Sequence, residues 1–154
     1  MNLLDQFVLQ HIQVSLLKAE LVQVSPEPGT QEAKVELNLT PRMLKADSGD
    51  KLPAYQVSAR LSCRGGAEDE PGPSFNARVG FEAIYQQVAG DPMDVSEFTA
   101  NHASLTRQLY PLLQQELRML LVRLGLEQLH LPFDLAAKVN SPESQTVKIS
   151  PSLH

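Results

Sequence analysis

Cysteine, positive charge and long apolar runs are all scarce in this chain of 154 residues. Cys63 is the only cysteine, which excludes an intramolecular disulfide and gives no sign of an oxidising compartment. No Lys or Arg precedes the first apolar residues, and the first charged residue is Asp5, so the N-terminus does not resemble a secretory signal. No segment reaches the length of a membrane-spanning helix. We therefore expect a cytoplasmic protein with no direct membrane insertion.

Acidic residues outnumber basic ones, which gives a net charge of −5. A nucleic-acid partner requires surplus Lys and Arg to displace counterions from phosphate, so nucleic-acid binding is not expected. The same charge argues against adhesion to an anionic membrane surface. The length and the 42% hydrophobic content predict one domain that is large enough to bury a core.

Residues that could carry out chemistry are scattered. The four histidines (His11, His102, His130 and His154) form no cluster that would hold a metal. Cys63 lies on the apolar face of a predicted strand, where cysteine usually behaves as a small hydrophobic residue. The sequence contains no glycine loop that would cradle a phosphate and no glycine-flanked nucleophile. We expect no enzymatic activity, no metal and no cofactor.

The first half of the chain alternates between apolar and polar residues, as half-buried strands do. Within residues 3–24 the apolar positions switch parity after Leu16, which indicates a β-bulge, although the first few residues fit a short helix equally well. A second strand, Lys34 to Leu39, is expected to stop at Pro41 because proline cannot donate to a strand ladder. A turn is predicted at Asp47–Asp50.

The third and fourth strands show the clearest alternation. They are predicted at Tyr55 to Cys63 and at roughly Ser74 to Ala89, joined by an acidic loop that includes Glu68–Glu70. The loop is interpreted as a solvated hairpin tip, with contact to a basic partner as the alternative.

The apolar period becomes helical from Asn101 to Leu124, where leucines form one broad stripe. Pro111 lies inside this pattern and is expected to kink the helix or mark a break. Asp134 is predicted to cap a short second helix, Leu135 to Val139. The breadth of the stripe leaves two interpretations open, namely a pure core and a core combined with a subunit interface.

Because consecutive strands precede the helices, the predicted class is α+β. The expected architecture is a four-stranded antiparallel sheet followed by a long helix and a short C-terminal helix. The domain is expected to span residues 1–139, with a polar C-terminal tail at 140–154.

The order and spacing of these segments resemble the SecB family of protein-export chaperones. The resemblance runs from about Phe7 to Val139 and is strongest at the aromatic–proline step Tyr110-Pro111 and in the run from Leu129 to Asp134. It implies a homotetramer, built as a dimer of dimers, that binds unfolded or partly folded polypeptides in apolar grooves without ATP. It also implies delivery of export clients to the translocation motor SecA.

The resemblance and the apolar strand faces together indicate ten candidate polypeptide-binding residues. They are Leu21, Val22, Val35, Leu37, Tyr85, Leu105, Leu109, Tyr110, Leu129 and Phe133. Glu20 fits one acidic position that contacts SecA in the family, whereas Val24 and Arg78 stand where further acids would be expected. The loop Pro26–Ala33 is also shorter than its family counterpart and lacks the aromatic residues that line the client groove.

These departures leave alternatives to a general chaperone for protein export. One alternative is a SecB-like adaptor or scaffold oligomer that binds one specific protein partner, such as a toxin–antitoxin component. Another is a small-molecule-binding protein or enzyme of the hot-dog type. In that fold the central helix follows the first strand, whereas here the long helix follows all four strands, which counts against it.

Overall fold

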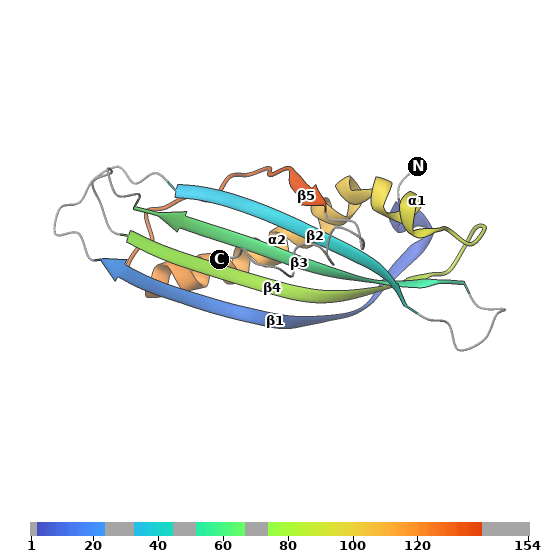
Figure 1. Ribbon diagram of the computed structural model, residues 1–154, viewed down its shortest axis with the longest axis horizontal. Helices are drawn as coiled ribbons and strands as arrows, with labels where there is room; N and C mark the ends of the chain where they lie inside the picture. The colour runs from blue at the N-terminus through green and yellow to red at the C-terminus, as the bar shows by residue number, and fades with distance from the viewer. Residues whose placement is uncertain (1–2, 24–32, 45–51, 67–73, 140–154) are drawn as a thin grey trace, which may run out of the picture.

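The structure is a computed structural model that describes residues 3–23, 33–44, 52–66 and 74–139. A sheet of long strands is covered on one face by a long helix (Figure 1). After a 3-10 turn at Leu3–Asp5, the elements in chain order are β1 (Phe7–Gln23), β2 (Ala33–Leu44), β3 (Ala54–Gly65), β4 (Ser74–Gln87), α1 (Val95–Ala100), α2 (His102–Arg123) and β5 (Ala137–Val139). The predicted α+β class, with four main antiparallel strands before a long helix, is confirmed.

The strands lie in the order β1-β4-β3-β2-β5. The pairs β1–β4, β4–β3 and β3–β2 are antiparallel, and the three-residue β5 adds to β2 in parallel. Among the described residues β1 therefore pairs along one side only. β1 and β2 follow each other in sequence but lie on opposite sides of the central β4–β3 pair.

The core lies between α2 and the inner face of the sheet, the face that α2 covers. Inward side chains of β3 and β4 alternate with outward ones, as predicted, and Tyr55, Val57 and Val79 are among those completely buried. On α2 the buried leucines recur at every fourth position. They are Leu105, Leu109, Leu113, Leu117 and Leu121. This spacing places them on one helix face, which packs against the sheet.

A short helix, α1, follows β4 and precedes α2 in the chain. It is not evident from the sequence, because six residues are too few to show a helical period. Asp94 caps it by accepting a 2.9 Å hydrogen bond from the backbone N–H of Glu97. Phe98 of α1 stacks on Tyr55 of β3, with ring centroids 4.2 Å apart, and the two side chains are fully buried. This contact fixes where the chain leaves the sheet and so where α2 begins.

The predicted bulge in the first strand is present, but it lies earlier than the parity of the sequence suggests. The register of β1 against β4 shifts between Val14 and Leu16, with further shifts near the two ends of the strand. Leu16 consequently pairs with Gly80 on the outer face, the face turned away from α2. Val14 and Leu17, on either side of the shift, both point to the inner face.

The prediction that Pro41 ends the second strand is wrong, since β2 continues to Leu44 with Pro41 opposite Val57. Proline is tolerated on an edge strand, where its missing N–H faces away from a neighbour. β5 pairs only with Leu37–Leu39, so β2 has no described neighbour on that side at Pro41.

The short C-terminal helix predicted at Leu135–Val139 is also wrong, because Ala137–Val139 form β5. Five residues are too few for a stable isolated helix, whereas the edge of β2 offers unpaired backbone groups. Pro111 does not break the long helix, which runs without interruption from His102 to Arg123. The predicted turn at Asp47–Asp50, the acidic hairpin tip and the tail at 140–154 lie outside the described residues.

Candidate functional site

A groove of about 670 Å³ lies between the N-terminal half of α2 and the segment that leads into β5. α2 contributes one wall, and residues 133–137 contribute the other. The lining is apolar for the most part, with polar groups between. It consists of His102, Ala103, Thr106, Arg107, Tyr110, Pro111, Gln114, Phe133, Asp134, Leu135, Ala136 and Ala137.

Tyr110 joins the two walls. Its side chain is buried, and its hydroxyl donates a 2.5 Å hydrogen bond to the carbonyl oxygen of Pro132. Burial raises the pKa of the Tyr110 hydroxyl, with the nearby Asp134 carboxylate adding to the effect, so the hydroxyl stays protonated and able to donate. The hydrogen bond joins the segment at Pro132 to the helix.

Phe133 is the most exposed large apolar side chain of the described chain, with 84% of its surface accessible. An exposed aromatic ring in the lining of an apolar groove is a candidate binding surface, since a ligand that buries the ring gains free energy from the hydrophobic effect. Arg107, Gln114 and Asp134 supply charged and amide groups within the same groove. The site can therefore accept apolar side chains together with the polar backbone of an extended peptide.

The structure divides the ten predicted polypeptide-binding residues by burial. Leu37, Tyr85, Leu105 and Leu109 have 0–1% exposure and belong to the core, so a polypeptide could contact them only if α2 moved. Val35 and Leu129 are half-buried. Tyr110 and Phe133 lie together in the groove, whereas Leu21 and Val22 are exposed at the far end of β1.

A second apolar surface lies where α2 leaves the β1 side of the sheet uncovered. Ile12, Val14, Leu17 and Leu21 of β1 pair with inward residues of β4, which places their side chains on the inner face. They are nevertheless 36–53% exposed. We call these four residues the β1 part of the uncovered strip.

The uncovered strip continues on one flank of α2. Leu112, Met119 and Val122 are 40–53% exposed and follow each other at helical spacing. Gln108 lies one turn before Leu112 on this flank and accepts a 2.6 Å hydrogen bond from the hydroxyl of Tyr85. Tyr85 belongs to β4, the neighbour of β1, so the flank is turned toward β1 and away from the groove. Leu112 belongs to the broad leucine stripe noted in the sequence, whereas Met119 and Val122 were not identified there, although they continue the same helical spacing.

The outer face of the sheet is polar and centres on Glu82. Its carboxylate accepts hydrogen bonds from Ser15 and Gln56, each at 2.9 Å, and from Ser58, and it forms a 2.9 Å ion pair with Arg60. Burial alone would raise the pKa of Glu82, but these donors hold the pKa below its ordinary value. A carboxylate that accepts this many hydrogen bonds holds the side chains around it in place. Its lowered pKa does not suit a general acid or base at neutral pH.

Residues with reactive or metal-binding potential do not come together in the described part of the chain. No group of three or more His, Cys, Asp or Glu side chains there could hold a metal ion. Cys63 is buried, and burial raises the pKa of its thiol to about 11, which leaves it uncharged at neutral pH. Among the described helices, none is long and apolar enough to cross a membrane.

Comparisons with known proteins identify the fold. No family model matches the sequence, and a comparison with curated proteins found no match. Among solved structures, the chain is similar to the SecB-like chaperone Rv1957 of Mycobacterium tuberculosis, determined in complex with a ChAD peptide from the HigA1 antitoxin. The TM-score is 0.62, the sequence identity is 23%, and the match covers 86% of this chain and 93% of the other. The SecB-like fold predicted from the sequence is thereby confirmed.

Proposed function

We propose that this protein is an ATP-independent chaperone that binds extended, non-native polypeptide segments in the groove between α2 and residues 133–137. The observation that carries the proposal is the exposed Phe133 ring in the lining of an apolar groove of about 670 Å³. Burial of apolar surface contributes roughly 25 cal/mol per Å² and requires no fixed pattern of hydrogen bonds. Such a groove can therefore hold segments of different sequence.

The fold supports the same proposal. The structurally similar SecB-like chaperone was solved with a peptide bound, which shows that this fold can accept a peptide. We further propose that the protein acts in the cytoplasm and assembles as a dimer of dimers, with the uncovered strip buried between copies. Contact with SecA through Glu20 stays a prediction. Glu20 is exposed on the outer face, but Arg78, where an acid was expected, lies exposed on the same face.

The proposal is tested with a permanently unfolded chain, reduced and carboxymethylated lactalbumin carrying a fluorescent label. The variant Phe133→Ser removes the exposed ring from the groove, and we expect it to weaken binding about tenfold, since full burial of such a ring is worth roughly 1.5–3 kcal/mol. Val88→Ser is the matched control, because Val88 is 55% exposed and is not among the groove residues. Equal binding by the wild type and both variants would refute the groove as the client site.

A second variant, Tyr110→Phe, tests whether the groove needs its second wall held in place. The substitution removes only the hydroxyl that donates to Pro132 and keeps the buried ring. We expect weaker binding of the unfolded chain with little change in stability, because one hydrogen bond contributes about 1 kcal/mol. Retention of full affinity would show that the connecting segment needs no such anchor.

The adaptor function remains the second candidate, and the polar part of the groove favours it. Arg107 and Asp134 place opposite charges in the lining, where they could recognise one defined sequence. The similar solved chaperone holds a peptide from an antitoxin, which is a defined partner. Measuring affinity for many unrelated unfolded peptides separates the two functions. A narrow range of affinities indicates a general chaperone, whereas one peptide bound at least a hundredfold more tightly indicates an adaptor.

A further inference from the structure

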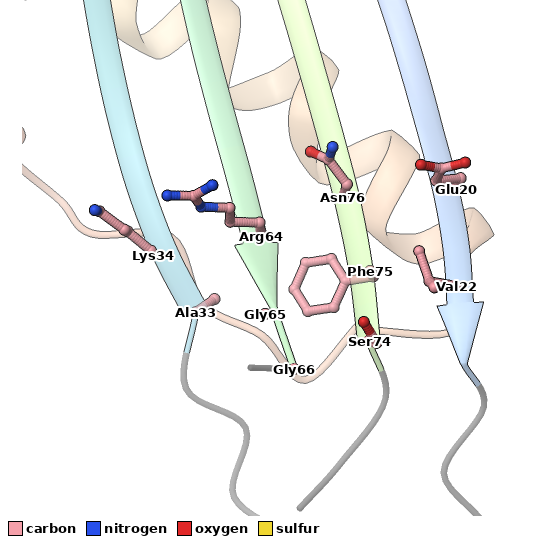
Figure 2. A pocket seen from close by; sticks show the side chains of 10 residues that line it. All are labelled: Glu20, Val22, Ala33, Lys34, Arg64, Gly65, Gly66, Ser74, Phe75 and Asn76. Carbon is pink, nitrogen blue, oxygen red and sulfur yellow. The ribbon is translucent and has the colours of Figure 1, made fainter. Parts of the chain in front are cut away.

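Polar residues cross the outer face of the sheet in a row near one end of the strands. Glu20 of β1 lies opposite Asn76 of β4, Asn76 lies opposite Arg64 of β3, and Arg64 lies opposite Lys34 of β2. Figure 2 shows these four side chains arranged across the four strands, with the helix behind the sheet. Two cations, Arg64 and Lys34, are therefore direct neighbours in this row.

A second pair of cations occupies the next row along the strands. Lys18 of β1 lies directly opposite Arg78 of β4. Like charges that face each other across a strand pair destabilise a sheet. We call Lys18, Lys34, Arg64 and Arg78 the basic corner, because all four are exposed on one region of the outer face.

Two described acids lie beside the basic corner, Glu20 in the first row and Glu36 in the second. Glu36 is shared by Lys34, at 3.2 Å, and by Lys138, at 3.5 Å, while Glu82 pairs with Arg60. Within the described ranges of the chain, Lys18, Arg64 and Arg78 form no ion pair. Among the described residues, the four cations of the basic corner and Lys138 therefore outnumber the two acids beside them, Glu20 and Glu36.

A hollow of about 760 Å³ lies at the same end of the sheet. Lys34 and Arg64 line it together with Glu20 and Asn76, and Val22 adds a side chain that is 65% exposed. The hollow therefore combines the guanidinium of Arg64, which forms no ion pair among the described residues, and the ammonium of Lys34 with an apolar contact. This combination suits a peptide that carries carboxylates as well as apolar side chains.

We propose that the basic corner docks an acidic, extended segment of a protein partner. The cations are few and close together, so they match several carboxylates on one short segment. A nucleic acid or an anionic membrane presents charge over a much larger area and would also meet the acidic remainder of the molecule. The proposal goes beyond the chaperone function, because the basic corner lies on the outer face and the groove lies beside α2.

Binding is measured by fluorescence anisotropy with a labelled eight-residue peptide that contains four glutamates and two leucines. Its counterparts replace each glutamate by glutamine or by lysine. We expect the glutamate peptide to bind at low salt and to weaken as salt screens the charges. We expect both counterparts to bind at least about tenfold more weakly.

Substitutions locate the binding site. The double variant R64Q/R78Q is expected to weaken glutamate-peptide binding about tenfold, since exposed ion pairs are individually weak and two would be lost. K18Q/K34Q removes the other two cations and provides an independent variant if the first fails to fold. R118Q/R123Q makes the same change in net charge at exposed positions of α2 and should alter binding less than twofold.

Several outcomes would overturn the proposal. One is an equal loss of binding in R64Q/R78Q and R118Q/R123Q, which would indicate a general charge effect. Another is tighter binding of a thymidine oligonucleotide or of phosphatidylserine vesicles than of the glutamate peptide, if R64Q/R78Q and K18Q/K34Q also lose that binding. The Phe133→Ser variant should bind the glutamate peptide normally, so failure of the chaperone proposal and failure of this one are distinguishable.

Discussion

Replacing Leu17 by Asp should dissociate the protein into smaller units. Leu17 lies at the centre of the β1 part of the uncovered strip and is 53% exposed, although its side chain points to the same face as the core. Three neighbours on β1 and three residues on α2 extend the strip. A surface of this kind is typical of a protein–protein interface, and β1 also offers an unpaired strand edge within the described part of the sheet.

The exposed fractions set the size of the effect. The seven side chains are 36–53% exposed, so together they present as much surface as about three fully exposed aliphatic side chains, worth roughly 5–9 kcal/mol if buried. A twofold-symmetric dimer buries two strips. The free energy from burying both is comparable to or larger than an association cost of about 4–15 kcal/mol. Asp at position 17 removes about 1 kcal/mol of apolar burial from each copy and places a carboxylate in the interface. The loss of about 3 kcal/mol or more corresponds to at least a hundredfold rise in the dissociation constant.

The assay is molar mass by light scattering after size exclusion, at several protein concentrations. The wild type should have the mass of several chains, and Leu17→Asp should lower the mass at the same concentration. Val88→Asp is the matched control, because Val88 is 55% exposed and lies outside the strip. A wild type that is monomeric at every concentration would refute the reasoning, as would a Leu17→Asp variant whose mass is unchanged.

Three further predictions concern stability and reactivity. Leu109→Ala removes a completely buried side chain of α2 and should lower the free energy of unfolding in urea by about 2–5 kcal/mol. The pKa of Glu82 is lower in the folded state than its ordinary value of 4.5, so Glu82 stabilises the fold above that pH and the contribution is lost as pH falls further. Glu82→Gln should therefore be less stable than the wild type at neutral pH and should show a flatter decline in acid, measured by urea unfolding across pH. Cys63, buried and with its pKa raised to about 11, should react with iodoacetamide at pH 8 only after unfolding, and rapid labelling of the native protein would contradict its burial.

Elements with a long, regular period could be predicted from the sequence. β3 alternates over ten residues and β4 alternates along its length except at Gly80, and each inward residue identified from the alternation is buried. The sequence of β5 could not be interpreted in this way, because three residues carry no period. Ala137–Val139 form a strand because the edge of β2 is available, which is a property of the tertiary structure. The same edge position explains why Pro41 is compatible with β2.

The candidate site could be predicted only in part. An apolar residue of α2 such as Leu105 looks the same in sequence whether it faces the sheet or the solvent, so core and surface leucines could not be separated. Phe133 was identified because it follows Pro132 in a recognisable run, but Arg107 and Pro111 line the groove through their position on the helix. Which flank of α2 faces β1 follows from the Tyr85–Gln108 hydrogen bond, and the sequence gives no sign of that contact.

The three surfaces occupy separate parts of the sheet, and this separation follows from its strand order. The uncovered strip lies on the inner face beside β1, and the groove lies across α2 beside β5, at the opposite edge. The basic corner lies on the outer face, because the alternation of side chains along each strand sends neighbouring residues to opposite sides. A copy of the chain seated on the uncovered strip would leave the groove and the basic corner accessible. The proposed assembly, client binding and docking of an acidic partner therefore use different surfaces, and we expect a client to bind without dissociating the oligomer.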